Sequence, residues 1–197
     1  AQTPEVCTEM IESAEILWKL VEHLTLTAAP AVAVGLLAVR RGIRSVPLIL
    51  TMALAASGLV AILAFWGFYA SPTIGKVWTL VVLFGSIEAI VWASWGGGLD
   101  RGTLRALRTP LLLWAFATGF VVFLGFLHGG ADAALHTASS RFSGGLPSDS
   151  DIPQYYSNWF YVHGHHGTPP LFPGEWHMSD RPPLQIGYVL SQRSLDW

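Results

Sequence analysis

Four apolar stretches, each close to the length that crosses a bilayer, dominate the first two thirds of the chain. They occupy residues 16–39, 46–70, 77–95 and 110–127. A transmembrane helix needs about 20 consecutive apolar residues. Only 12% of the residues are charged and 52% are hydrophobic, whereas a soluble domain carries about 25% charged residues. The pattern predicts an all-α protein: a polytopic transmembrane helical bundle with four spans in residues 1–128. Pro110 is expected in the first turn of the fourth span, where its missing N–H costs little.

The connections between these stretches predict an orientation. Six of the eleven Lys and Arg residues lie in two connections: Arg40, Arg41, Arg44, Arg101, Arg105 and Arg108. The positive-inside rule places both connections in the cytoplasm. The N-terminus and residues 129–197 are then extracytoplasmic. The net charge of −2 gives no reason to expect a nucleic-acid partner, and membrane lipid is the expected surrounding.

The segment 129–197 is predicted to be an extracytoplasmic loop that contains short interfacial helices and the start of a further helix. Asp149 and Asp151 precede an aromatic helix that begins at Ile152, with Pro in its first turn. This helix is expected to lie in the membrane interface. Two interpretations of the acids stay open. Asp151 is either only an N-cap, or one of the pair is a general base that takes a proton from an acceptor hydroxyl.

A second motif, Asp180-Arg-Pro-Pro-Leu, predicts another helix start near the two prolines, capped by Ser179 or Asp180. The functional alternative assigns Arg181 to a phosphate, which a guanidinium binds through two parallel hydrogen bonds. Asp180 would then orient Arg181 or hold a divalent cation.

Taken together, the two motifs resemble the first large external loop of the GT-C membrane glycosyltransferases, in the protein O-mannosyltransferase and aminoarabinose transferase clan. That loop runs roughly Asp-Glu-x-x-Tyr and later Asp-Lys-Pro-Pro-Leu before the next membrane helix. Here Asp151-Ile-Pro-Gln-Tyr155 matches the first part and Asp180-Arg-Pro-Pro-Leu184 matches the second. The resemblance covers about residues 146–190.

The resemblance implies an enzyme of the plasma membrane, bacterial by analogy, that transfers a sugar from a polyprenyl-phosphate donor to an acceptor at the outer face. Asp151, with Asp149 as its rival, would be the base, and Arg181 would contact the lipid phosphate. Asp180 would order that region or a divalent metal ion. Tyr155 and Gln185 are candidate substrate contacts.

The chain departs from the family pattern in three ways. Ile152 stands where the family has Glu, or Ser150 does if Asp149 is the match, so the base stays open between the two acids. Four predicted spans precede the loop where the family has one, which makes the N-terminal bundle an added module. The chain also ends soon after an apolar start at Leu184, so we expect a fragment of a longer enzyme.

Histidines between the two motifs form a candidate metal site. His163, His165, Glu175 and His177 offer the imidazole and carboxylate ligands that suit Zn²⁺ or another transition metal. Their spacing matches no closed zinc motif, and the alternative is a polar loop near head groups or substrate.

Glu88 is the acid in the middle of a predicted span. It is either a functional intramembrane site or is hydrogen-bonded to Ser86, Thr79 or a hydroxyl of another helix. The first option defines a rival hypothesis, a transporter or channel component in which Glu88 faces a watery cavity. A third hypothesis is a non-catalytic membrane scaffold whose acids only cap helices.

Overall fold

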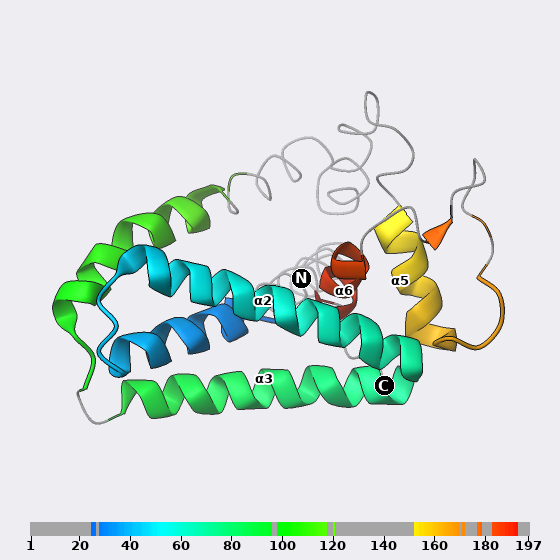
Figure 1. Ribbon diagram of the computed structural model, residues 1–197, viewed down its shortest axis with the longest axis horizontal. Coiled ribbons are helices and arrows are strands. Elements are labelled where there is room, and N and C mark those ends of the chain that lie inside the picture. The colour runs from blue at the N-terminus through cyan, green and yellow to red at the C-terminus, as the bar shows by residue number, and fades with distance from the viewer. Residues whose placement is uncertain are drawn as a thin grey trace, which may run out of the picture.

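The computed structural model describes residues 25–26, 28–95, 98–117, 120, 152–169, 171, 177–178 and 183–192. Over these residues the protein is helical and contains no strand. A helix at Ala28–Arg40 is followed by α2 (Val46–Ala70), α3 (Pro72–Ser94) and a helix at residues 101–117. Two shorter helices, α5 (Ile152–His163) and α6 (Pro183–Gln192), complete the described part (Figure 1).

Helices α2 and α3 form an antiparallel hairpin with Ser71 as its single connecting residue. Ser71 is extended and its N–H donates to the carbonyl of Gly67, which ends α2. Pro72 then begins α3, because a proline at the first helical position loses no intrahelical hydrogen bond. The prediction that this span begins at Val77 is therefore wrong by five residues, and Lys76 lies within α3 rather than in a loop.

Both hairpin helices are long and apolar enough to cross a membrane. They contain 25 and 23 residues, so each extends about 35 Å at 1.5 Å per residue, against a hydrocarbon core of about 30 Å. Large apolar side chains point outward along them, with Leu54 72% exposed and Phe84 64% exposed. Length, composition and this exposed apolar surface favour a membrane protein.

The other two predicted spans are described only in part. The helix at Ala28–Arg40 covers the second half of the first predicted span, and the helix at residues 101–117 covers the first half of the fourth. Residues 16–24 and 121–127 lie outside the described part. A bundle with four spans therefore stays a prediction.

Arg40, Arg41 and Arg44 precede α2, and we call this end of the structure the basic end. Here the side chain of Asp100 caps a helix. Its carboxylate accepts hydrogen bonds from the N–H of Thr103 at 3.1 Å, the hydroxyl of Thr103 at 2.6 Å and the N–H of Gly102 at 3.4 Å. These are the N–H groups that the first turn of a helix leaves without an intrahelical partner. The helix consequently begins at residue 101.

This helix start corrects two expectations. Arg101, Arg105 and Arg108 lie on a helix rather than in a loop, and Pro110 lies in the helix interior rather than in the first turn. An interior proline removes one N–H from the hydrogen-bonding ladder, a loss that membrane helices accommodate by local adjustment. The aspartate cap, and not the proline, determines where the helix begins.

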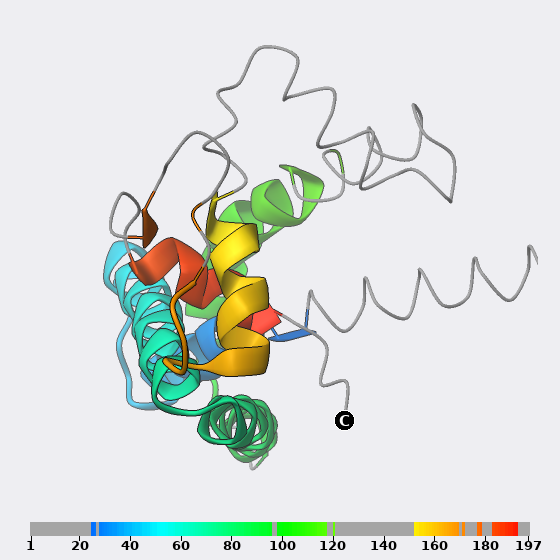
Figure 2. The same ribbon diagram turned by 90° about the vertical axis from the view of Figure 1, so that its right-hand side faces the viewer.

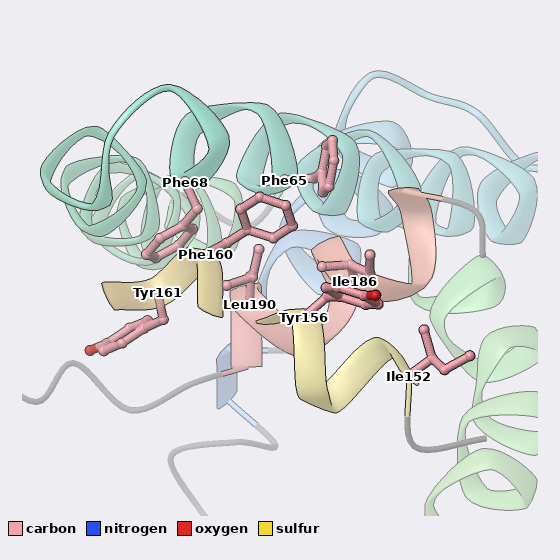
Figure 3. Packing of buried hydrophobic residues seen from close by; sticks show 8 residues of the cluster. All are labelled: Phe65, Phe68, Ile152, Tyr156, Phe160, Tyr161, Ile186 and Leu190. Carbon is pink, nitrogen blue, oxygen red and sulfur yellow. The ribbon is translucent and has the colours of Figure 1, made fainter. Parts of the chain in front are cut away.

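Away from the basic end, α6 packs against α2, and α5 packs against α6 and the α2–α3 hairpin. Figure 2, which views the structure from the side of the α2–α3 turn, shows both helices on one flank of α2. Eight buried residues form their common hydrophobic cluster: Phe65, Phe68, Ile152, Tyr156, Phe160, Tyr161, Ile186 and Leu190 (Figure 3). Three of the five aromatic residues of α5 are thus buried in protein contacts. The burial accounts for these aromatics without a helix lying flat in the membrane interface.

Helix α6 lies beside the middle of α2. A Cβ atom on Gly187 would overlap the backbone carbonyl of Ala61, and Gly58 lies opposite the hydroxyl of Tyr188. Such close backbone approach requires a residue without a side chain. Because Gly58 and Ala61 are central in α2, α6 lies along the apolar part of the hairpin.

Candidate functional site at the start of α5 and α6

The predicted site residues divide into described and undescribed ones. Tyr155, His163, His165, His177 and Gln185 are described. Five others lie outside the described residues: Asp149, Asp151, Glu175, Asp180 and Arg181. The geometry can therefore be built only from the helices that follow the two motifs.

The two helices that follow the motifs meet in one place. Ile152 is the residue after Asp151 and opens α5, as the sequence predicts. Ile186 lies in the first turn of α6, which begins at the second proline of the Asp180-Arg-Pro-Pro-Leu motif. Both isoleucines are 0% exposed and belong to the same cluster (Figure 3). The fold thus brings the first turns of α5 and α6 together although they are about thirty residues apart in sequence.

The two predicted substrate contacts that are described flank this cluster. Tyr155 is half-buried, packs against the cluster and meets the ring of Tyr156 edge-on, with 5.3 Å between centroids. Gln185 precedes the buried Ile186 and is exposed. Both side chains are therefore placed at the margin of the packed region and not inside it.

His165 caps α2. Its Nδ1 atom lies 2.9 Å from the carbonyl oxygen of Tyr69 and 3.1 Å from that of Ala70. Carbonyl oxygens only accept, so Nδ1 carries the proton and donates. The last carbonyls of a helix lack intrahelical partners, and the imidazole satisfies them. This contact fastens the end of α5 to the end of α2.

Gly164 makes this contact possible. Its φ of 59° lies in the left-handed region, and its N–H donates to the carbonyl of Phe160 to close α5. A Cβ atom at this position would lie 3.0 Å from Pro72 Cδ and 3.2 Å from the carbonyl oxygen of Phe68. Glycine therefore permits both the turn and the approach of His165 to α2.

His163 is engaged within α5 itself. Its ring stacks on Trp159 with 4.1 Å between centroids and 19° between planes, and its Nδ1 lies 3.3 Å from the Trp159 carbonyl oxygen. The indole N–H of Trp159 is buried and has no hydrogen-bond partner in the part of the chain that the structure describes. His166 lies against His165, with 4.2 Å between ring centroids.

The metal prediction gains no support from these positions. Among residues that the structure describes, no three His, Cys, Asp or Glu side chains gather closely enough to hold an ion. His163 and His165 each direct Nδ1 to a helix carbonyl, and His177 is exposed. The contacts of His163 and His165 fit helix capping better than ligation, and a metal site that includes Glu175 stays a prediction.

A cation lies near the same end of the bundle. The ammonium of Lys76 lies 4.8 Å from the centroid of the Tyr161 ring, within range of a cation–π interaction. The sequence did not indicate that Tyr69 is a neighbour of His165 or that Lys76 is a neighbour of Tyr161. These contacts join residues far apart in the chain, and no local pattern signals them.

One hydrogen bond considered for Glu88 is excluded, and its other interpretations stay predictions. Glu88 is exposed on α3, whereas Thr79 and Ser86 are buried on another part of the helix. The hydroxyl of Thr79 donates to the carbonyl of Gly75 at 3.1 Å. The predicted hydrogen bond between Thr79 and Glu88 is therefore not formed. The small cavity lined by Thr79, Trp78 and Ser191 does not include Glu88, so it offers no support for a transporter site.

The helices and their contacts define a class rather than a particular activity: a helical protein in which two helices are able to cross a membrane and two shorter ones pack on their flank. No protein-family model, curated protein or solved structure matches this chain.

Proposed function

We propose that this chain is part of a membrane glycosyltransferase that transfers a sugar from a polyprenyl-phosphate donor to an acceptor at the outer membrane face. One observation supports the proposal most. The helices that follow the acidic motif and the Asp180-Arg-Pro-Pro-Leu motif share one buried cluster on α2, in which Ile152 and Ile186 are fully buried. A joint site for the two motifs needs these helix starts to be neighbours.

The proposed reaction is an inverting displacement. Asp149 or Asp151 takes the proton from an acceptor hydroxyl, whose oxygen attacks the anomeric carbon of the donor sugar. The bond from that carbon to the phosphate oxygen breaks, and polyprenyl phosphate leaves. Arg181 stabilises the charge that develops on the phosphate, and Asp180 orients Arg181.

The distribution of charge supports an external site. The basic residues at Arg40, Arg41 and Arg44 precede α2, whereas α5 ends at the α2–α3 turn. The two groups therefore lie at opposite ends of α2 (Figure 1). If the basic end is cytoplasmic, α5 lies toward the outer face, where lipid-linked sugars are used in the family that the motifs resemble.

The test is transfer of a labelled sugar from a polyprenyl-phosphate donor, measured with the full-length protein in its own membranes. The variants are Asp149→Asn, Asp151→Asn and the double variant. Loss of transfer in one single variant and retention in the other would identify the base. Retention in all three, with normal protein levels in the membrane, would reject the proposed base.

The scaffold hypothesis predicts a different outcome for the same variants. If Asp151 only caps α5, then Asn, which is an equally good cap, leaves both stability and any activity unchanged. The transfer assay therefore separates the two cases, and a parallel comparison of thermal unfolding checks that a loss of transfer is not a loss of stability. A catalytic aspartate loses transfer without losing stability.

A further inference from the structure

The helix at residues 101–117 carries a row of arginines along one face. The Asp100 cap sets the start of the helix, so Arg101, Arg105 and Arg108 follow one another at intervals of four and three residues. Side chains with this spacing are neighbours on a helix surface. All three are exposed.

The first half of this helix is held firmly against the bundle. Leu107 is 6% exposed and belongs to a buried cluster with Ala38, Val39 and Ile49. Leu104 packs against the same cluster. The helix that carries the arginine row therefore lies against the bundle beside the start of α2 (Figure 1).

A shallow, open groove of about 660 Å³ lies along the exposed face of the helix, and the described residues that line it all belong to this one helix. Arg105 and Arg108 line one end of it. The rest of its lining is apolar: Leu104, Leu111, Leu112, Trp114 and Ala115. From residue 105 to residue 115 the helix rises about 15 Å, which is a length that a lipid head group and the first part of an acyl chain can follow.

The two arginines of the groove differ from Arg40 in what they contact. Arg40 donates to the carbonyl oxygens of Trp92 and Trp95 and is thus committed to the end of α3. Within the described ranges, no ion pair joins Arg105 or Arg108 to an acidic side chain. Asp100, the acid at the start of this helix, is bound to Gly102 and Thr103.

We propose that this groove binds an anionic glycerophospholipid. Its phosphate lies between the guanidinium groups of Arg105 and Arg108, which are suited to bidentate phosphate contacts. One acyl chain lies along Leu111, Leu112 and Trp114. We infer an anionic lipid because the groove is positively charged at one end and apolar at the other, which matches the charged head group and the acyl chain of such a lipid. A free phosphate would not cover the apolar part of the groove. The positive group in the head of a zwitterionic lipid would be repelled by the arginines.

The site is independent of the proposed sugar transfer, since it lies at the other end of α2 from α5. The test uses the purified full chain in nanodiscs or neutral detergent. Native mass spectrometry counts bound phosphatidylglycerol against phosphatidylcholine. We expect the double variant Arg105→Gln/Arg108→Gln to lose about tenfold in affinity for phosphatidylglycerol, which corresponds to about 1.4 kcal/mol.

The matched control is Arg41→Gln/Arg101→Gln, which removes the same charge from exposed positions that do not line the groove. It should change the affinity less than twofold. Equal losses in both double variants would mean diffuse attraction by charge and would overturn the site. If the Gln variant does not fold, Arg105→Lys/Arg108→Lys keeps the charge but loses the bidentate geometry and should still weaken binding.

A second experiment tests whether the groove binds a lipid or a free anion. Leu112→Asn leaves both arginines intact and should weaken phosphatidylglycerol binding, while inorganic phosphate at millimolar concentration should not displace the lipid. Full displacement by inorganic phosphate, or unchanged lipid binding in Leu112→Asn, would overturn the proposal.

Discussion

The guanidinium carbon of Arg40 lies 3.9 Å from the centroid of the Trp92 ring, and the same guanidinium donates to the carbonyl oxygens of Trp92 and Trp95. A cation thus closes the C-terminal end of α3, where helix carbonyls lack partners and the helix dipole is negative. The contact joins residues more than fifty positions apart. It gives one arginine of the basic end a structural role that its neighbours Arg41 and Arg44 do not share.

We expect Arg40→Ala to destabilise the bundle by about 1–2 kcal/mol, because it removes a cation–π contact and two charge-assisted hydrogen bonds. In a chain of this size that change lowers the Tm by about 2–8 °C. Thermal unfolding followed by circular dichroism measures it. Arg41→Ala, which removes an exposed arginine next in sequence, is the control. Equal effects of the two changes would contradict the capping role.

Gly187 should tolerate no side chain. Gly187→Ala places a Cβ atom against the carbonyl of Ala61 and must move α6 away from α2. We expect a loss of about 1–3 kcal/mol, as for other overpacked contacts. The control is Gly85→Ala, where a Cβ atom meets nothing within 4 Å and the change should stabilise α3 by about 0.5–1 kcal/mol. Thermal unfolding of both variants tests the pair, and equal stability would exclude the close approach.

Asp100 should make the start of the helix at residues 101–117 sensitive to acid. The hydrogen bonds from the Thr103 hydroxyl and N–H, and the one from Gly102, hold the pKa of this carboxyl below its ordinary value of 3.8, with a further contribution from the charge of Arg44. The folded state therefore prefers the ionised form. Its stabilisation is fully present above the ordinary value and disappears as the pH falls through the lowered pKa.

The measurement is hydrogen exchange at residues 101–105 between pH 7 and about pH 3, compared with Asp100→Asn. Asparagine also accepts hydrogen bonds at a helix N-terminus, so the variant should resemble the parent at pH 7 and lose the acid dependence. An equal acid response in parent and variant would assign the effect to another group.

His165 should fasten α5 to the hairpin. We expect His165→Ala to cost about 0.5–1.5 kcal/mol, since it leaves the carbonyls of Tyr69 and Ala70 without their donor. Hydrogen exchange of α5 should rise. His166→Ala, which removes an exposed ring that makes no such bond to α2, is the matched control. Faster hydrogen exchange of α5 in His166→Ala alone would show that the contact between the His165 and His166 rings, and not the His165 cap, holds α5.

Under the proposed function, Arg181→Ala should lower sugar transfer by about 10²–10³-fold, the loss typical of removing one donor to a developing negative charge. Arg181→Lys keeps the charge and should retain part of the activity. Transfer assays at saturating donor measure both. Equal activity of the Ala variant and the parent would remove Arg181 from the site.

Several helix boundaries were predictable because they depend on residues within one turn. The apolar run at residues 46–70 coincides with α2, and α5 begins at Ile152 beside Pro153 as expected. Prediction failed where a stronger local signal was overlooked. Helix α3 begins at Pro72, before the apolar run that was used to predict it. The next helix is capped by Asp100 and begins at residue 101, well before Pro110.

The sequence predicted which residues belong to the candidate site but not how they are arranged in space. The acids, Arg181 and Glu175 were chosen from motifs, and they stay predictions. The structure adds that Ile152 and Ile186, in the first turns of α5 and α6, belong to one buried cluster that also includes Phe65 and Phe68. It also adds that His165 binds helix carbonyls, which a metal-ligand pattern does not anticipate.

The amino-acid sequence alone determined the helical class, the capacity of residues 46–70 to cross a bilayer and the start of α5 beside Pro153. These properties follow from side-chain hydropathy and from backbone hydrogen bonding over a few residues. Only the tertiary structure decided that α6 lies along the middle of α2 and that Arg40 closes α3. Such contacts join residues dozens of positions apart, and their geometry arises from close packing, which no local pattern records.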